Sequence, residues 1–174
     1  MKSSVGESPK FAGDPIADSL AVVTFSNSAI LALADGVSWG IKSRLASNCG
    51  IYGSLKYLDQ HLSLCKTTRD VFTEILKSFE YAHECILTLH GTMTTLCVGV
   101  VVQLNEKNRY GLCVVNVGDS YAYIYNKQYG VKEVTERSHP LDQMHDMRNS
   151  RWAIGPADGY NPDLCNLTCS FVIL

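Results

Sequence analysis

The 174-residue sequence lacks a strong charge bias, and it has no apolar run long enough to cross a membrane. Its 15 lysines and arginines are balanced by 17 aspartates and glutamates, which leaves a net charge of −2. This balance gives no electrostatic reason to expect binding to nucleic acid or to an anionic membrane. We therefore predict that the chain has neither a nucleic-acid partner nor a membrane partner.

The start of the chain lacks the apolar core of a secretory signal. Met1–Asp14 is polar and contains serine, glycine and proline, so residues 1–14 are predicted to form a flexible lead-in. The remaining residues, 15–174, have the length of one domain, and a hydrophobic content of 46% is enough for a buried core. We expect an intracellular protein, cytoplasmic or nuclear.

The sequence also lacks the paired cysteines of a structural zinc site. Its seven cysteines are Cys49, Cys65, Cys85, Cys97, Cys113, Cys165 and Cys169. Only Cys165 and Cys169 are close in sequence, and there is no second close pair. Several of the others stand inside apolar runs, where a free thiol behaves as a small hydrophobic group. We therefore predict buried free thiols.

Hydrophobic periodicity predicts strands on both sides of a helical middle. The predicted strands are 20–25, 29–34, 96–104, 110–117, 121–125 and 131–134, and the predicted helices are 42–58 and 68–89. The buried stripe of the first helix is predicted to be Leu45, Cys49, Tyr52, Leu55 and Leu58. Thr67 or Thr68 is placed to cap the second helix. A strand pair, a helix pair and a strand meander together indicate an α+β fold.

The segment Ala34-Asp35-Gly36 has the chemistry of a cation site, because it follows the apolar run 29–33. A strand that ends in Asp-Gly can direct a carboxylate and a backbone carbonyl toward one point. Both are hard oxygen ligands that suit Mg²⁺ or Mn²⁺. Asp-Gly is also a common turn signal, so the pair can equally be a plain corner between strands.

Other acidic residues have equally simple structural interpretations. Asp18 can cap a turn, and Asp119 can accept hydrogen bonds from the backbone of its own turn. A further group in one irregular stretch comprises His139, Asp142, His145 and Asp146. That stretch contains proline and gives no helical spacing to its two histidines, so it is a weak zinc candidate.

Four segments in a fixed order carry a resemblance to a known family. They are Ile16–Val23, Ala34–Gly40, Gly91–Leu96 and Val114–Ala122, the last containing Gly118-Asp119-Ser120. In this order they resemble the PPM-type, or type 2C, metal-dependent serine/threonine protein phosphatases. Val134–His139 and Trp152–Gly155 resemble two later signals of that family. The resemblance covers most of the chain and makes residues 15–174 a PPM-type phosphatase-like domain.

The resemblance implies both a fold and a metal centre. The fold would be two packed antiparallel β-sheets flanked by helices, an α/β/β/α sandwich that is incomplete at its C-terminus. Two Mg²⁺ or Mn²⁺ ions would activate water to hydrolyse phosphoserine or phosphothreonine in a phosphoprotein substrate. Asp18, Asp35 and the carbonyl of Gly36 would hold these ions, and Asp119 would lie near an auxiliary ion.

The sequence departs from the family pattern at several positions near this centre. Gly13 replaces an arginine that clasps the substrate phosphate, and Ala17 replaces a glutamate that hydrogen-bonds metal-bound water. Val37 replaces a histidine or methionine and cannot act as a general acid. Ser38-Trp39 replaces a glycine pair, and Tyr121 replaces an arginine. The two acidic motifs that complete the metal centre in the family are not found in these residues.

These departures leave three interpretations open. The chain can be part of a working phosphatase, a pseudophosphatase that binds a protein partner, or an unrelated α+β domain with a coincidental match. The sequence ends on the apolar run Ser170–Leu174, which resembles an interrupted core strand. We expect the chain as it stands to be inactive, with Phe171–Leu174 lacking neighbours, and to aggregate or bind another chain.

Overall fold

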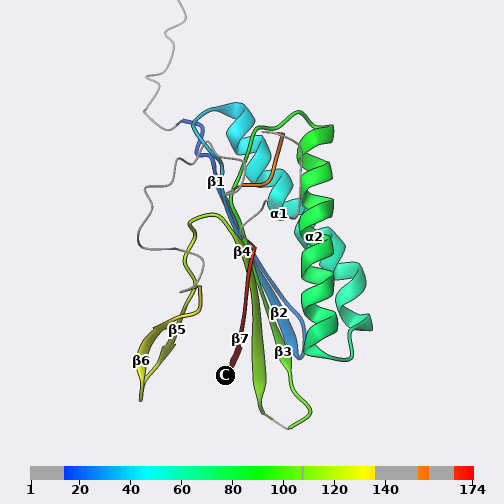
Figure 1. The fold of residues 1–174 in the computed structure, drawn as a ribbon, viewed down its shortest axis with the longest axis vertical. Helices are drawn as coiled ribbons and strands as arrows, with labels where there is room; N and C mark the ends of the chain where they lie inside the picture. The colour runs from blue at the N-terminus through cyan, green and yellow to red at the C-terminus, as the bar shows by residue number, and fades with distance from the viewer. Residues whose placement is uncertain (1–13, 107, 136–152, 157–166) are drawn as a thin grey trace, which may run out of the picture.

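The computed structural model describes residues 14–106, 108–135, 153–156 and 167–174 (Figure 1). Its strands are β1 (Asp18–Thr24), β2 (Ser28–Asp35), β3 (Leu96–Gln103), β4 (Tyr110–Val117), β5 (Tyr123–Asn126), β6 (Gly130–Glu133) and β7 (Thr168–Ile173). Its helices are α1 (Ile41–His61), the short 3₁₀ helix η1 (Leu62–Leu64) and α2 (Thr68–Thr88). The predicted elements therefore all form, with shifts of a few residues at their ends.

The described strands form two antiparallel sheets. The larger has the order β1-β2-β3-β4-β7, and the smaller pairs β5 with β6. Figure 1 shows α1 and α2 on one side of the larger sheet and the β5–β6 hairpin on the other. This confirms the α+β class with two antiparallel sheets and helices outside them.

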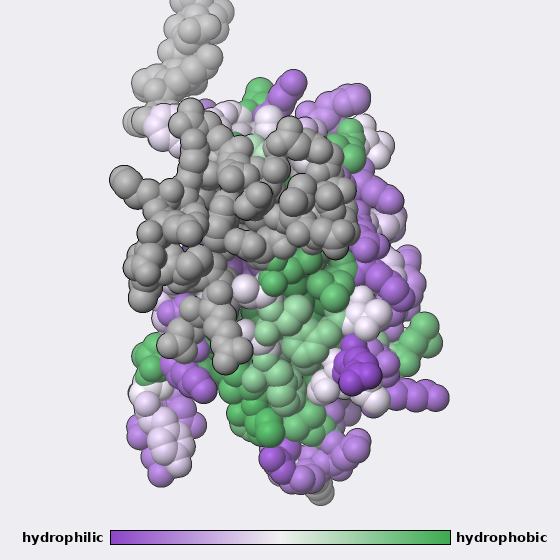
Figure 2. Space-filling model, viewed as in Figure 1, coloured by the Kyte–Doolittle hydropathy of each residue, from purple (hydrophilic) through white to green (hydrophobic). Residues whose placement is uncertain are grey.

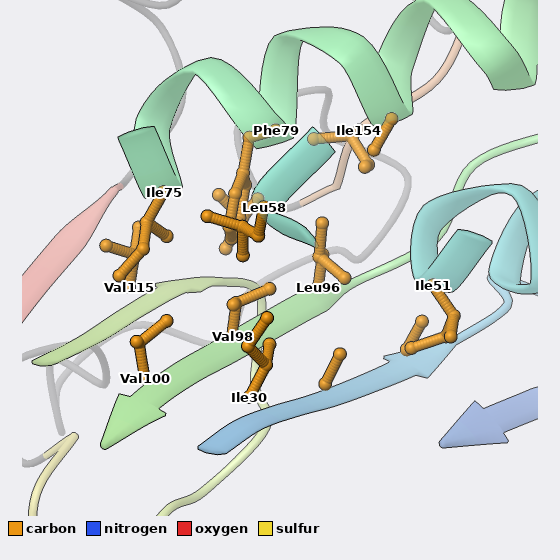
Figure 3. Packing of buried hydrophobic residues seen from close by; sticks show 14 of the residues in the cluster. Ile30, Ile51, Leu58, Ile75, Phe79, Leu96, Val98, Val100, Val115 and Ile154 are labelled. Carbon is orange, nitrogen blue, oxygen red and sulfur yellow. The ribbon is translucent and has the colours of Figure 1, made fainter. Parts of the chain in front are cut away.

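The main core lies between the helices and the larger sheet (Figure 3). Phe79 and Ile75 of α2 and Leu58 of α1 point toward strand residues such as Val98 and Val115, and all five are buried. The α2 residues repeat at helical spacing, as the sequence predicted, because burial of one apolar stripe stabilises a helix that is exposed on its other side. This layer fixes the position of every strand that carries a candidate site residue.

The predicted stripe of α1 lies in or against the core except at Tyr52, and the buried face extends beyond it. Tyr52 is 59% exposed, whereas the buried positions are mostly small: Ser43, Ala46, Ser47, Cys49, Gly50, Ile51, Gly53, Ser54 and Leu58. Small residues allow the α1 backbone to approach α2 and the sheet closely. Ser54 can be buried there because its hydroxyl donates to the carbonyl of Gly50 at 2.8 Å. The apolar spacing alone did not indicate this face.

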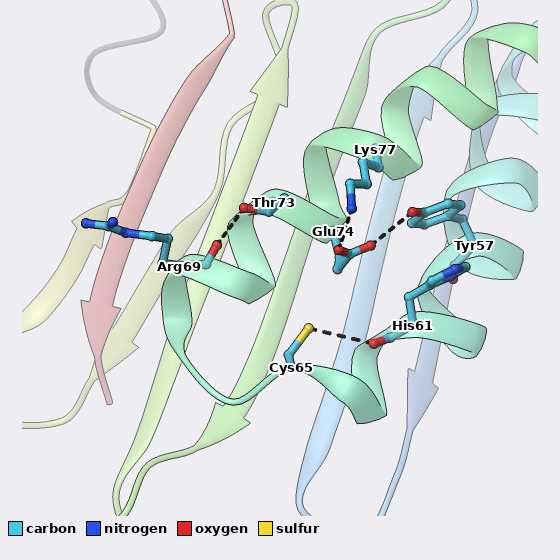
Figure 4. A network of polar contacts seen from close by, with 7 residues as sticks. All are labelled: Tyr57, His61, Cys65, Arg69, Thr73, Glu74 and Lys77. Atoms are coloured by element: carbon cyan, nitrogen blue, oxygen red, sulfur yellow. Dashed lines mark hydrogen bonds and ion pairs between the residues drawn. The ribbon is translucent and has the colours of Figure 1, made fainter.

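A polar network that includes none of the candidate residues Asp18, Asp35 and Asp119 joins α1 and α2 (Figure 4). The Tyr57 hydroxyl donates to Glu74 Oε2 at 2.9 Å, and Glu74 Oε1 pairs with Lys77 Nζ at 2.8 Å. The His61 ring stacks on Tyr57 with a centroid distance of 4.1 Å. The polar groups of this cluster are partners of one another, so we assign the cluster to the packing of α1 on α2.

The start of α2 forms the predicted cap at Thr67. The Thr67 hydroxyl accepts the Asp70 amide at 3.1 Å, and Asp70 Oδ2 accepts the Thr67 amide at 2.9 Å. Together they form a capping box. The Asp70 carboxylate lies at the positive end of the helix dipole, and hydrogen bonds from Lys66 and Thr67 lower its pKa.

Replacing Thr67 with alanine is expected to reduce the free energy of unfolding by about 1 kcal/mol. The Asp70 amide loses its side-chain acceptor, and the Asp70 carboxylate that accepts the Thr67 amide is held less firmly. Urea denaturation followed by circular dichroism measures this loss. Thr73→Ala is the matched control, because Thr73 is an exposed residue inside the same helix. An equal loss in both variants would contradict the assigned cap.

The C-terminal run forms a paired strand, which corrects the expectation that Phe171–Leu174 lacks neighbours. β7 pairs antiparallel with β4 from Gly111↔Ile173 to Asn116↔Thr168. Gly111 makes room for Phe171, because a Cβ at Gly111 would lie 2.7 Å from the ring. Phe171 and Ile173 stay partly exposed, and Figure 2 shows apolar side chains gathered over this lower part of the sheet.

The cysteines of the described residues are free thiols. Cys49, Cys97 and Cys113 are buried, as predicted, and burial raises the pKa of Cys97 and of Cys113 to about 11. Such thiols are unreactive near neutral pH. Cys65 and Cys85 are half-buried and Cys169 is exposed, while Cys165 lies outside the described residues.

Candidate metal centre

The register of the first hairpin brings two of the predicted carboxylates together. Asp18 begins β1 and Asp35 ends β2, and the two are direct partners across the ladder. Since side chains alternate along a strand, Asp35 lies on the same face as Leu31 and Leu33, opposite to the helices. The pair therefore opens toward the side of the sheet that carries β5 and β6.

The surroundings of Asp35 disfavour the charged form of its carboxyl group. Partial burial, a side-chain hydrogen bond with Asp18 and repulsion from Asp18 and Asp119 raise its pKa to about 6. Two or three carboxylates that repel one another favour any cation that comes between them. All the available donors are oxygen, which suits Mg²⁺ or Mn²⁺ rather than a softer metal. The chemistry of this donor set fits a hard divalent cation.

The backbone of Asp35 is held from three directions by Thr94 and Thr95. Its amide donates to Thr95 Oγ1 at 3.0 Å, and its carbonyl accepts the Thr95 amide and the Thr94 hydroxyl, both at 2.9 Å. Both threonines are fully buried. The Gly91–Leu96 segment, predicted only as a family signal, therefore positions the carboxylate.

Gly36 is at a position where no side chain fits. A Cβ there would lie 2.4 Å from the Ser43 carbonyl oxygen and 2.9 Å from the Ala17 carbonyl oxygen. The Gly36 amide donates to that Ala17 carbonyl at 3.3 Å, so the backbone just after β2 stays beside the residue that precedes β1. Glycine is required here because the two backbones approach closely.

Asp119 lies farther from the Asp18–Asp35 pair. It is exposed in the turn after β4, where Gly118 has a φ of 111° and Asn116 Nδ2 donates to the carbonyls of Gly118 and Ser120. Within the described ranges, no three side chains of His, Cys, Asp or Glu are close enough together to hold a metal ion. Asp119 therefore affects Asp35 through its charge, and Asp18 and Asp35 are the close pair.

The family departures near the pair have clear structural roles. The Ala17 carbonyl supports Gly36, and Val37 is fixed through its backbone, its amide donating to the Met93 carbonyl at 2.9 Å. Tyr121 is half-exposed and stacks on Tyr123 with ring centroids 6.1 Å apart. The side chains of Ala17 and Val37 can supply neither an acid nor a base. Gly13 and the group His139, Asp142, His145 and Asp146 lie outside the described residues.

Sequence reasoning missed the contact between His83 and Gly155. Gly155 has a φ of 133°, and its amide donates to His83 Nδ1 at 3.1 Å. Ile154 next to it exchanges two backbone hydrogen bonds with Thr94, at 2.9 and 3.0 Å. The segment 153–156 therefore supports the threonines that hold Asp35, and no local signal links it to α2.

The contribution of His83 is expected to lower stability as pH drops below about 6.5, whereas Asp35, whose pKa is raised, acts in the opposite direction. Burial lowers the pKa of His83, and its Nδ1 must stay unprotonated to accept the Gly155 amide. The unfolded chain binds a proton at His83 more readily than the folded protein does. The contribution of His83 to stability is therefore complete above the pKa of the unfolded chain, and it is lost as pH falls through the lowered pKa of the folded protein. The melting temperature at pH 5 relative to that at pH 7 should be higher for His83→Gln than for the parent; equal changes in the two proteins would contradict this role.

In the part of the chain that the structure describes, no helix has both the length and the apolar character of a membrane span.

Comparison with known proteins adds independent evidence. No protein-family model matches the sequence. A PP2C-like domain-containing protein of Drosophila melanogaster is 42% identical over 169 residues, which is 93% of this chain and 24% of that protein. The chain thus spans about a quarter of the length of this curated relative.

The fold of the chain agrees with that of a solved phosphatase structure. The Mycobacterium tuberculosis serine/threonine phosphatase PstP/Ppp matches with a TM-score of 0.57 at 17% identity, over 94% of this chain and 69% of that one. The PP2C phosphatase domain of SpoIIE from Bacillus subtilis matches with a TM-score of 0.49 at 16% identity, over 90% and 37% of the two chains. The ordered motifs, the two antiparallel sheets and the relative at 42% identity lead to one conclusion: the chain carries a divergent PPM-type, or PP2C-like, phosphatase-like domain.

Proposed function

We propose that this domain binds Mg²⁺ or Mn²⁺ at Asp18 and Asp35 and hydrolyses phosphoserine or phosphothreonine in a phosphoprotein. The observation that carries this proposal is the pairing of Asp18 with Asp35 across the first hairpin; burial, and then the neighbouring Asp18, raise the pKa of Asp35 to about 6. A bound divalent cation would neutralise phosphoryl charge and supply an activated water. Two carboxylates are few ligands for such a cation, so further oxygen ligands would be needed to complete the centre.

The residues of this chain have distinct parts in that reaction. Asp18 and Asp35 would hold the cation, with the carbonyl of Gly36 as a further oxygen ligand and Asp119 near an auxiliary ion. Thr94 and Thr95 would keep the Asp35 backbone fixed through the hydrogen bonds described above. A rigid carboxylate avoids reorganisation during the reaction. No described side chain beside the pair serves as general acid, so the leaving oxygen would take its proton from water.

A second candidate function is a pseudophosphatase that binds a protein partner. The observation that favours it is Val37, whose apolar side chain directly follows the Asp35-Gly36 pair where the family has a histidine or methionine. The domain would then keep the fold and a cation but lack turnover.

Phosphate release from a phosphothreonine peptide distinguishes the two functions. The protein in its longest natural form is assayed with and without Mn²⁺. Asp35→Asn should reduce turnover at least 100-fold, while Asp59→Asn, an exposed acidic residue on α1, should have no effect. Absence of Mn²⁺-dependent turnover in a folded protein would reject the phosphatase and favour the pseudophosphatase.

A further inference from the structure

A groove of about 670 Å³ lies beside the candidate metal centre. Its lining includes Asp14, Pro15, Val37, Trp39, Ile41 and Lys42. Both lining segments also lead to the carboxylates, because residues 14–15 run into β1 before Asp18 and Val37 directly follows Asp35-Gly36. The groove is therefore lined by residues that lie close in the chain to Asp18 and Asp35, although neither carboxylate lines it.

The loop that forms one wall of the groove is fixed at its base. The Ser43 hydroxyl donates to the Val37 carbonyl at 2.8 Å, and the Val37 amide donates to the Met93 carbonyl at 2.9 Å. Beyond this anchor the backbone turns outward, with a φ of 70° at Ser38 and 107° at Gly40. The turn leaves Trp39 and Ile41 each 78% exposed.

An exposed tryptophan on a fixed loop is a strong candidate contact residue. Tryptophan can bury roughly 150–250 Å² in a contact, and it is among the residues that contribute most to protein interfaces. At this place the family pattern has two glycines, whereas this chain has Ser38-Trp39. The large apolar surface is therefore a feature of this chain and not of the shared metal site.

The charge on the helix side of the groove favours an acidic ligand. Lys42 is exposed in the first turn of α1, and that turn contains no acidic residue. The side chain thus adds to the positive end of the helix dipole. Asp14 lies on the opposite wall and carries the other charge of the lining. An occupant that is apolar at Trp39 and acidic at Lys42 complements this surface.

We propose that Trp39, Ile41 and Lys42 bind the segment of a phosphoprotein that flanks its phosphorylated residue. An apolar side chain of that segment packs on Trp39 and Ile41, and an acidic side chain pairs with Lys42. The domain thereby prefers phosphorylation sites with apolar and acidic neighbours. This inference rests on the proposed function for the position of the phosphorylated residue itself.

The test compares two fluorescein-labelled phosphothreonine peptides of equal length, one flanked by leucine and glutamate and the other by glycine and lysine. Fluorescence polarisation measures their binding to the protein in its longest natural form with Mn²⁺ present. The first peptide should bind at least 10-fold more tightly. Trp39→Ala should reduce that ratio to about 1, and Lys42→Ala should reduce it several-fold. Tyr52→Ala, an exposed aromatic change elsewhere on α1, is the matched control and should preserve the ratio.

Turnover of p-nitrophenyl phosphate by the parent protein is measured separately, because this small substrate has no flanking residues. A Trp39-dependent preference without turnover would support the groove and reject the phosphatase. Turnover with equal binding of both peptides would support the phosphatase and reject the groove. A change of oligomeric state in Trp39→Ala, seen by light scattering, would assign the surface to a second copy and overturn the proposal.

Discussion

Replacing Gly53 with alanine is expected to lower the free energy of unfolding by about 2–3 kcal/mol, although alanine is the better helix former. A Cβ at Gly53 would lie 2.6 Å from the Cα and 3.1 Å from the amide nitrogen of Ala82. Both atoms belong to the backbone of α2, so no side-chain rotation relieves the contact. The helices must separate, and the core beneath them loses packing.

Gly50→Ala provides the matched control one turn earlier in α1. There the new Cβ would be 3.4 Å from Thr94 Cγ2, an ordinary contact distance. The gain in helix propensity should dominate and stabilise the protein by up to about 1 kcal/mol. Urea denaturation of both variants gives the comparison. If Gly53→Ala were as stable as Gly50→Ala, the close crossing of α1 and α2 would be wrong.

Asp35→Asn is expected to have opposite effects on metal binding and on the stability of the metal-free protein. Without metal, the variant should be more stable at pH 7.5 by about 1 kcal/mol, because it removes a charge that burial, Asp18 and Asp119 all disfavour. The partial exposure of Asp35 keeps this figure small through solvent screening. The same change should abolish the rise in melting temperature that Mn²⁺ produces in the parent, since ligand binding stabilises only a protein that can bind.

Scanning calorimetry with and without Mn²⁺ measures both effects, and Asp59→Asn is again the control. A variant that is less stable than the parent without metal would show that Asp35 has a structural role as a turn residue. An undiminished Mn²⁺ shift would place the cation elsewhere.

The elements of the fold were predictable because each depends on local chemistry. The capping box at Thr67, the apolar stripe of α2 and the β-branched residues of β3 and β4 all express preferences that act over a few residues. The order of the acidic and glycine motifs indicated the family for the same reason, since each motif is short and contiguous. Asp18, Asp35 and Gly36 were found in this way.

The burial of the small residues of α1 could not be predicted from apolar spacing, because it depends on how closely another backbone approaches. Gly53 faces Ala82, and Ser54 is buried with its hydroxyl satisfied inside the helix. Exposure of Tyr52 has the same cause, since the contact with α2 and the sheet uses the faces with small residues.

The candidate site depends both on local sequence signals and on contacts between residues far apart in the chain. The sequence by itself determined the carboxylates, the glycine and the strands that carry them. Only the tertiary structure decided that Asp18 lies opposite Asp35, that Thr94 and Thr95 hold the Asp35 backbone, and that Trp39 stands exposed beside them. The physical reason is that strand register and long-range hydrogen bonds join residues far apart in the chain, and no local preference specifies those partners.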